Sequence, residues 1–223
     1  MSLPARSLPT SLPALVTRLR GVLPPALLTA VLAAALALAG AAPARADDSA
    51  ARAESEADYA RYGGAVAYGT VLSDGRRTAS EVVVTAAVVA AASDREIGSE
   101  ADPDIIPPGF YDLGTNRSRG HVIGRQLGGS GDVEANLVAL YQNRANSPVM
   151  SGCEGAIADH LRDGLAAGDD LYYRVEPVYG STAQDHPTAV WLYATDNGAV
   201  LVDMLISNTP EATVTYGSGN RIC

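Results

Sequence analysis

The run "NRSRGHVIGRQLGGSGDVEANLVALYQNRAN", residues 116–146, differs in charge from the rest of the chain. It holds four arginines and four asparagines but only two acids, and three of the arginines lie close to His121. The whole sequence of 223 residues has 16 arginines against 25 acids, a formal net charge of −9. So acidic a chain needs a local basic cleft or a metal ion to bind an anion, and this run is the candidate for that cleft.

The residue pattern within and after this run predicts two short strands and a helix. Residues 121–129 are expected to start extended and to meet a glycine-rich turn, "GGSGD", which lacks the ending of a phosphate-binding P-loop and is interpreted as flexible. Residues 136–142 are a second short strand. Residues 147–168 are the main helix, with Ser147 as its cap and Pro148 in its first position. Its apolar residues recur at helical spacing: Val149, Cys153, Ala156, Ile157, Leu161 and Leu165.

The segments on either side predict an antiparallel sheet. Residues 65–87 form a hairpin around "SDGRR", because Asp-Gly is a strong turn signal. Residues 92–116 are rich in loops. Three later segments, 171–181, 187–208 and 212–217, are expected to be antiparallel strands, with a hairpin turn at Asn197-Gly198. The fold class is therefore α+β, with an antiparallel sheet and one main helix over residues 65–223.

The first 46 residues have the pattern of a secretory signal peptide. Arg18 and Arg20 precede an apolar run of 15 residues, 26–40, and "ARA" at 44–46 offers a cleavage site after Ala46. The alternative is an uncleaved membrane anchor, but the apolar run is shorter than the roughly 20 residues that span a bilayer. We therefore expect a secreted protein without stable membrane association. Cleavage removes four arginines and no acid, which leaves a net charge of −13.

Two further features follow from this expected export. Residues 47–64 are polar and acidic, and are interpreted as a short helix or a loose leader ahead of the domain. Cys153 and Cys223 are the two cysteines, and in an exported protein such a pair suggests a disulfide. The alternative is a buried thiol at Cys153 and a free thiol at the C-terminus.

The residue types around His121 meet the needs of phosphodiester hydrolysis. Histidine suits the role of a base that activates water, because its reference pKa lies near neutrality. Mg²⁺ suits the neutralisation of charge on the phosphate, and it accepts one or two protein oxygens while keeping most of its waters. An asparagine carbonyl just before a helix is such an oxygen. Asn146 is the preferred ligand, and Asn143 is its rival.

These residues resemble the non-specific DNA/RNA endonucleases of the ββα-metal fold. "SRGH" at 118–121 is similar to the family's Asp-Arg-Gly-His motif, and "NSPVMSGCE" at 146–154 is similar to its Asn-to-Glu segment. "NLVALYQ" matches the strand that begins with a supporting asparagine. The resemblance covers roughly residues 105–168, and it implies a ββα-metal core that cleaves DNA, with RNA as a further substrate.

The resemblance also implies roles for single residues. His121 would be the general base, and Asn146 the direct ligand of Mg²⁺, with Mn²⁺ and Ca²⁺ as alternatives. Glu154 would hold a metal-bound water. Arg119 would stabilise the phosphate or shape the cleft, and Asn136 would orient the loop that carries His121.

One departure from the family motif leaves other functions open. Ser118 stands where the family has aspartate, so a secreted binding or structural protein on the same fold is an alternative. A nuclease toxin with a protein inhibitor as its partner is another. Three arginines have no firm match but are candidates for the cleft: Arg125, Arg144 and Arg162. His160 and His186 lack such neighbours and are expected to be solvated surface residues. The sequence leaves the oligomeric state unknown.

Overall fold

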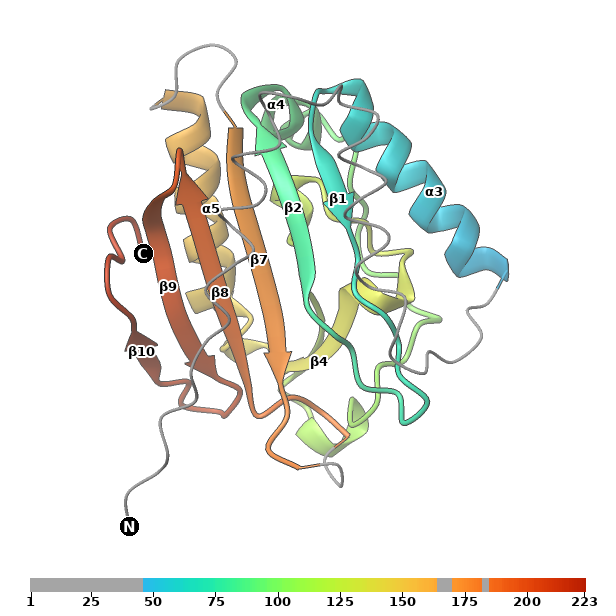
Figure 1. Ribbon diagram of the computed structural model, residues 1–223. Helices are drawn as coiled ribbons and strands as arrows, with labels where there is room; N and C mark the ends of the chain where they lie inside the picture. The colour runs from blue at the N-terminus through green and yellow to red at the C-terminus, as the bar shows by residue number, and fades with distance from the viewer. Residues whose placement is uncertain (1–45, 164–169, 182–184) are drawn as a thin grey trace. The chain divides into compact units, whose positions relative to one another are not determined.

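A six-stranded antiparallel sheet forms the scaffold of the protein (Figure 1). The computed structural model describes residues 46–163, 170–181 and 185–223, so the predicted signal segment lies outside the described residues except for Ala46. The strands follow the order β1-β2-β7-β8-β9-β10 across the sheet. Their bounds are β1 Ala65–Ala67, β2 Ser80–Thr85, β7 Asp170–Val178, β8 Ala189–Asp196, β9 Ala199–Ser207 and β10 Val214–Tyr216.

The strands alternate between buried and less buried residues, as expected for a sheet with one face in the core. On β7, Leu171, Tyr173 and Val175 are fully buried, and the residues between them are not. Both hairpins that the sequence predicted are present. Gly75, with φ of 82°, lies in the turn between β1 and β2, and Asn197-Gly198, both with positive φ, joins β8 to β9.

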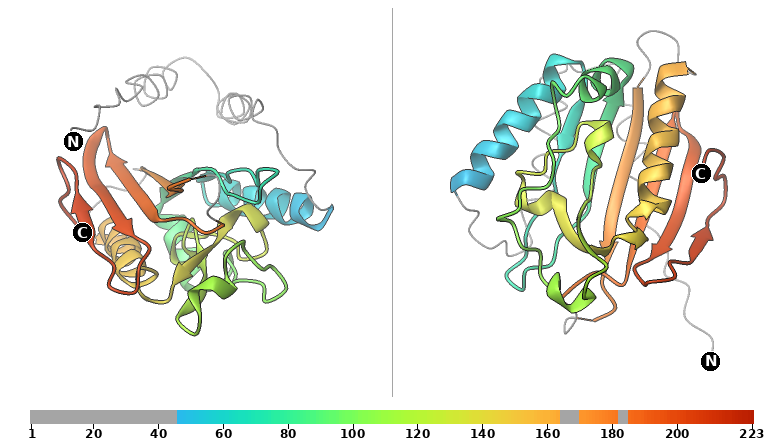
Figure 2. Two further views of the ribbon diagram at one scale, coloured as in Figure 1. Left: turned by 90° about the horizontal axis from the view of Figure 1, so that it is seen from below. Right: turned by 180° about the vertical axis from the view of Figure 1, so that it is seen from behind.

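The site-bearing segment is an insertion between two neighbouring strands of this sheet. β2 pairs with β7, although residues 86–169 lie between them in the chain. The inserted part contains α4 (Ala86–Ser93), the antiparallel pair β3 (Arg117–His121) and β4 (Leu137–Tyr141), and α5 (Val149–Asp163). In the view from behind, this segment covers one face of the sheet (Figure 2). The order β3, β4, α5 is that of the predicted ββα core, but β3 ends at His121, where the sequence analysis expected the extended segment to start.

Helix α3, Ala46–Arg61, is tied to this core, so of the two forms expected for residues 47–64 the structure has the helix. Tyr59 is fully buried, and its hydroxyl donates a hydrogen bond of 2.6 Å to the carbonyl of Leu127. The carboxylate of Asp48 accepts a bond of 2.6 Å from the backbone N–H of Glu134. The helix is therefore packed against the loop that follows His121.

The two other helices differ from the sequence expectations. α4 was not predicted, because its run of alanine and valine has no polar face and periodicity cannot distinguish a buried helix from a strand. α5 begins at Val149, so Ser147 and Pro148 do not form its first turn. They form the short strand β6, which pairs with β5, Asn143–Arg144. Within the described residues, no helix has the length and apolarity needed to cross a membrane.

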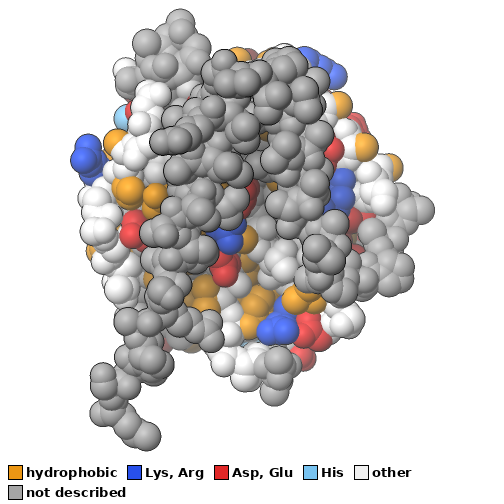
Figure 3. Space-filling model, viewed as in Figure 1, with side chains coloured by type: hydrophobic (Ala, Val, Ile, Leu, Met, Phe, Trp, Pro, Cys, Tyr) orange, Lys and Arg blue, Asp and Glu red, His pale blue; other side chains and the backbone are white. Residues whose placement is uncertain are grey.

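The opposite face of the sheet carries paired charges. Arg174 on β7 bonds to Glu81 on β2 and, at 2.9 Å, to Glu176. Figure 3 shows positive and negative side chains lying next to one another on the described part of this face. Because these cations already have anionic partners, this face is a poor candidate for binding a polyanion.

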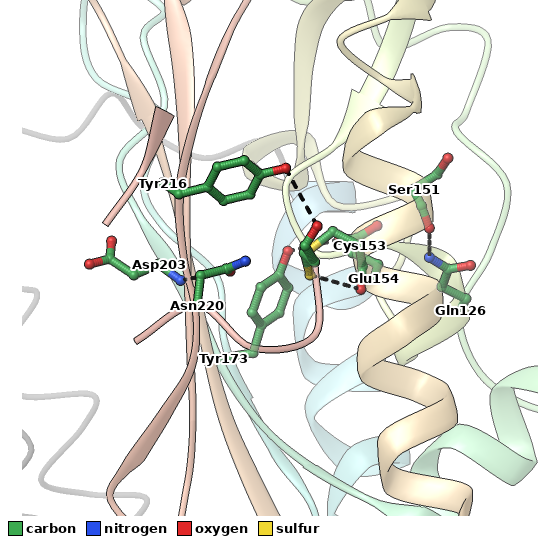
Figure 4. Close-up of a disulfide and its surroundings, with 9 residues drawn as sticks. Gln126, Ser151, Cys153, Glu154, Tyr173, Asp203, Tyr216 and Asn220 are labelled. Carbon is green, nitrogen blue, oxygen red and sulfur yellow. Dashed lines mark hydrogen bonds between the residues drawn. A yellow bond between two sulfur atoms is a disulfide. The ribbon is translucent and has the colours of Figure 1, made fainter. Parts of the chain in front are cut away.

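The C-terminus is fastened to α5 by the predicted disulfide between Cys153 and Cys223 (Figure 4). The bond links two residues that are 70 positions apart in the sequence. Cys153 is buried on the side of α5 that faces the sheet, next to Glu154. The alternative of two free thiols is therefore wrong.

Replacing Cys223 with serine should destabilise the protein. Opening a loop of this length costs about 4 kcal/mol in the chain-entropy model, so the midpoint of thermal unfolding should fall by several degrees. Thermal unfolding of parent and Cys223→Ser proteins, with and without reductant, measures this. Reductant should lower the unfolding midpoint of the parent to that of the variant and leave the midpoint of the variant unchanged. A parent insensitive to complete reduction would contradict the stabilising role.

Candidate functional site

His121 lies at the end of β3, opposite Leu137 of β4. Its Nε2 is 3.0 Å from the backbone carbonyl oxygen of Ser99. A carbonyl oxygen can only accept, so Nε2 carries the proton in this bond. The other ring nitrogen, Nδ1, is then the unprotonated one in the neutral ring and can accept a proton.

The surroundings of His121 favour its neutral form. Burial lowers the pKa of His121 below its ordinary value of 6.5, and the charge of Arg125 lowers it further. The Ser99 carbonyl and the charges of Glu100 and Asp132 act in the opposite direction on the pKa without reversing the shift. The imidazole is therefore a neutral base at pH 7.

Asn136 holds the loop that follows His121. It is fully buried, and its Oδ1 accepts a bond of 2.7 Å from the N–H of Ile123. Its Nδ2 donates to the carbonyls of Ile123, at 3.1 Å, and Ser130, at 2.9 Å. One side chain thus fixes both ends of residues 123–130.

The glycine-rich turn is largely buried and hydrogen-bonded to other parts of the chain. The N–H of Ser130 donates to the hydroxyl of Tyr68 at 2.9 Å, and the N–H of Gly131 donates to Ser99 Oγ at 2.8 Å. A Cβ on Gly129 would lie 1.8 Å from the carbonyl oxygen of Ile123. Glycine is needed there because the backbone folds tightly against itself.

Asn146 lies beside the strand residue that precedes His121. Its Nδ2 donates a bond of 2.9 Å to Gln142, and its Oδ1 would lie 3.2 Å from a Cβ on Gly120. That same Cβ would meet Leu140 at 2.4 Å, which explains the glycine of the Arg-Gly-His motif. Within the described part of the chain, the Asn146 Oδ1 accepts no hydrogen bond, so this carbonyl oxygen fits the role of a metal ligand.

Few other side chains could hold a metal ion. The described residues contain no group of three or more His, Cys, Asp or Glu side chains with suitable placement. Asn143, the rival ligand, is exposed on β5.

Glu154 is enclosed between the loop after His121 and the sheet. The N–H of Gly124 and the hydroxyl of Tyr173 both donate to its Oε1, at 2.9 and 3.3 Å. Tyr173 and Glu154 lie next to the disulfide in Figure 4. Burial raises the pKa of Glu154 to about 8, so the carboxyl is largely protonated at neutral pH. These contacts fasten Gly124 to α5; the role of Glu154 beside a metal-bound water stays a prediction.

The side chain of Arg119 is held in place by backbone carbonyls. Its Nε donates to Ile105 at 2.8 Å and its Nη2 to Pro103 at 2.7 Å, which fixes the loop next to β3. Of its two predicted roles, these contacts favour the shaping of the cleft. Ser118 donates to the carbonyl of Leu140 at 3.1 Å and so supports the β3–β4 pair.

The remaining candidates lie at different distances from the site. Arg125 pairs with Glu100, at 3.2 Å, next to the residue that binds His121. Arg144 is exposed in the turn before Asn146, with φ of 90°. Arg162 is on α5, paired with Asp159. His160 and His186 are half-buried rather than solvated, and His160 bonds to Asp196 at 3.3 Å.

Two important contacts gave no signal in the sequence. Ser99 binds His121 through its backbone, which any residue type could provide. Asn208, beyond β9, is buried and bonds to the backbone of Tyr141 and Ala139 on β4, at 2.9 and 3.1 Å. Asn208 is 67 positions from Tyr141 in the sequence, so local patterns could not predict this contact.

Comparisons with known proteins agree with this arrangement. The model of the DNA/RNA non-specific endonuclease family matches residues 90–197. The fold is similar to that of the Sda1 nuclease with a bound zinc ion, at 16% identity and a TM-score of 0.52, covering 71% of this chain and 80% of that one. It is also similar to NucA from Streptococcus agalactiae with a magnesium ion bound, at 16% identity and a TM-score of 0.54, covering 69% of this chain and 80% of that one. No match was found among curated protein sequences.

These findings define the class of the protein as a nuclease with a ββα-metal fold. The match to the DNA/RNA non-specific endonuclease family covers residues 90–197, just under half of the chain, and includes β3, β4 and α5. The fold class and the family that the sequence predicted are confirmed.

Replacing Glu154 with glutamine should change how stability depends on pH. The folded protein keeps a proton on Glu154 up to about pH 8, whereas an unfolded chain releases it near the ordinary value of 4.5. Stability of the parent should therefore fall as pH rises from about 5 to 8, with a contribution from this group of up to about 1.4 kcal/mol per pH unit. Denaturant unfolding at several pH values measures this slope.

Glu154→Gln should lose that part of the slope, because an amide does not titrate. Glu56→Gln is the matched control, since Glu56 is exposed on α3 and its replacement should leave the slope of the parent unchanged. Equal slopes in all three proteins would show that Glu154 does not hold its proton.

Proposed function

We propose that the protein is a secreted, metal-dependent endonuclease that hydrolyses phosphodiester bonds in DNA and RNA without sequence preference. The observation that carries this proposal is the placement of Asn146 Oδ1 beside Gly120, the residue before His121. The neutral ring of His121 and the Asn146 oxygen thereby lie near the same end of the β3–β4 pair, although Asn146 is on the side that Gly120 faces and the His121 side chain leaves β3 on the other. Export rests on the signal pattern of residues 1–46, and the domain would begin after it.

His121 would act through Nδ1. The Ser99 carbonyl holds Nε2–H, which fixes the ring orientation and leaves Nδ1 for the attacking water. As the water oxygen bonds to phosphorus, its proton passes to Nδ1, the bond to the leaving oxygen breaks, and the leaving oxygen takes a proton from solvent water. Asn136 and Glu154 keep the ring in place by fixing the loop at Ile123 and Gly124.

Asn146 is the residue that would hold the divalent ion. Its amide is oriented by the bond from Nδ2 to Gln142, which turns Oδ1 toward β3. A bound ion would neutralise the negative charge that builds on the phosphate during the reaction. The magnesium in NucA and the zinc in Sda1 support a divalent ion. We propose Mg²⁺, because a neutral amide oxygen with few other protein ligands suits an ion that stays largely hydrated.

Removing the base or the ligand should abolish most activity. His121→Ala should slow cleavage of plasmid DNA by about 10²–10⁴-fold, the usual contribution of a positioned base. Asn146→Ala should lose at least as much metal-dependent rate, because charge on the phosphate would no longer be neutralised. A plasmid-cleavage assay with Mg²⁺, repeated with chelator, measures both.

His160→Ala is the control for this experiment. His160 is the histidine on α5, bonded to Asp196 of β8, and it takes no part in the proposed site. Its replacement should leave cleavage within a few-fold of the parent. Full activity of His121→Ala would refute the assignment of the base, and undiminished cleavage in chelator would refute the metal.

Activity should fall at acid pH, at a value set by His121. Because burial lowers the pKa of His121, the ring stays unprotonated to a pH below 6.5 and only then loses its ability to accept a proton. The acid limb of kcat/KM should therefore have an apparent pKa below 6.5. Arg125→Gln should raise this apparent pKa, since it removes a nearby positive charge. An acid limb at or above 6.5 in the parent would mean that His121 is not the titrating group.

A further inference from the structure

A recess with cationic and aromatic walls lies at the start of β3. It has a volume of about 420 Å³ and is lined by Phe110, Tyr111, Thr115, Arg117 and Arg119, with no acid among them. We call it the Arg–aromatic recess. It is a shallow recess that is open to solvent.

The arginines of the Arg–aromatic recess lie over the aromatic rings. The guanidinium of Arg119 is 4.6 Å from the ring centre of Phe110. That of Arg117 lies 5.2 Å from the ring centre of Phe110 and 5.3 Å from that of Tyr111. Phe110 is buried and serves as their support, whereas Tyr111 is 65% exposed. A large aromatic ring is thus offered to solvent beside a positive charge.

The two arginines also differ from most others in the protein. Seven arginines in the described ranges pair with carboxylates: Arg52, Arg61, Arg76, Arg77, Arg125, Arg162 and Arg174. Arg117 and Arg119 bond only to backbone carbonyls among the residues that are described. Their charge is therefore not neutralised, although the protein has a net charge of −9 and many acids to offer.

The Arg–aromatic recess shares a strand face with the catalytic base. Side chains two residues apart on a strand point the same way, so Arg117, Arg119 and His121 of β3 lie in one row. Arg117 and His121 are four residues apart, which corresponds to about 13 Å along the strand. A nucleic acid chain cleaved at His121 would reach the recess within a few nucleotides.

We propose that the Arg–aromatic recess is a subsite for an unpaired nucleotide, in which Tyr111 stacks on the base and Arg117 binds a phosphate. Bases expose their flat faces only where they are unpaired, and stacking on an aromatic ring tolerates every base. The subsite therefore favours single-stranded or locally opened nucleic acid without reading its sequence. This inference rests on the proposed function, because it assumes that the chain cleaved at His121 continues along β3.

The test measures the binding of labelled oligonucleotides in chelator, so that no cleavage occurs. Tyr111→Ala should bind a single-stranded oligonucleotide about 5-fold to 150-fold more weakly than the parent, the usual range for one base stacked on an aromatic ring. Its binding to a blunt duplex should not change, since the bases there are covered. In cleavage of single strands, KM should rise and kcat should stay constant.

Three further variants make the outcome specific. Tyr111→Phe keeps a ring and should bind like the parent. Tyr216→Ala removes a comparably exposed tyrosine, 54% exposed on β10, and should also bind like the parent. Arg117→Gln should weaken the binding of single-stranded and of duplex oligonucleotides alike. It should also reduce the slope of log K against log salt by about 1.

Failure of the subsite can be told apart from failure of the nuclease function. Unchanged single-strand binding by Tyr111→Ala, or an equal loss on duplex, would overturn the subsite, even if cleavage depends on His121. A selective single-strand loss in a protein that cleaves nothing would support the subsite and reject the hydrolytic function.

Discussion

The site depends on the hydrogen bonds of the buried Asn136 amide. It bonds to both backbone groups of Ile123 and to the carbonyl of Ser130, and so closes the loop that begins after His121. Without the Asn136 side chain, the buried backbone groups of Ile123 and Ser130 would lose their hydrogen bonds. Each such loss would cost about 1–3 kcal/mol of folding stability. The loop in turn carries Gly124, which Glu154 fastens to α5. One amide thus couples β3, β4 and the helix.

The six-stranded sheet holds both ends of the inserted segment. β2 and β7 are neighbours, so the inserted ββα segment leaves the sheet and returns to it at adjacent positions. Asn208 bonds β4 to the far end of the sheet, and Tyr59 of α3 bonds to Leu127 beyond His121. These tethers come from parts of the chain outside the ββα core. They explain why residues before and after the matched region, 90–197, belong to the same folded unit.

The distribution of charge distinguishes the surface beside β3 from the outer face of the sheet. On the outer face of the sheet, Arg174 is neutralised by Glu81 and Glu176. Beside β3, Arg117 and Arg119 lie on aromatic rings instead of carboxylates. Stacking keeps a guanidinium in place without cancelling its charge, so an acidic protein can still present a positive surface to a polyanion.

The sequence determined the elements that rest on local patterns. The strands 65–67, 80–85 and 137–141, the turn at Asn197-Gly198 and the helix around Cys153 all follow from neighbouring residues, because turn preference and hydrophobic periodicity are local properties. Helix α4 could not be predicted for the same reason, since its run of alanine and valine has no polar residue to set a period. The family resemblance identified His121, Asn136 and Asn146 as candidate site residues, but it predicted no contact between them.

Only the tertiary structure decided what those residues touch. The partner of His121 is a backbone carbonyl at Ser99, which leaves no trace in the residue type. Burial raises the pKa of Glu154 to about 8, although the hydrogen bond from Tyr173 acts in the opposite direction. Tyr173 lies on a strand that the sequence could predict but not place beside α5. Likewise, the backbone of the turn at "GGSGD" bonds to Tyr68 and Ser99, two partners that the turn's own sequence does not indicate. The sequence determines which groups are present, whereas burial and long-range hydrogen bonds determine their charge and orientation, because both depend on residues distant in the chain.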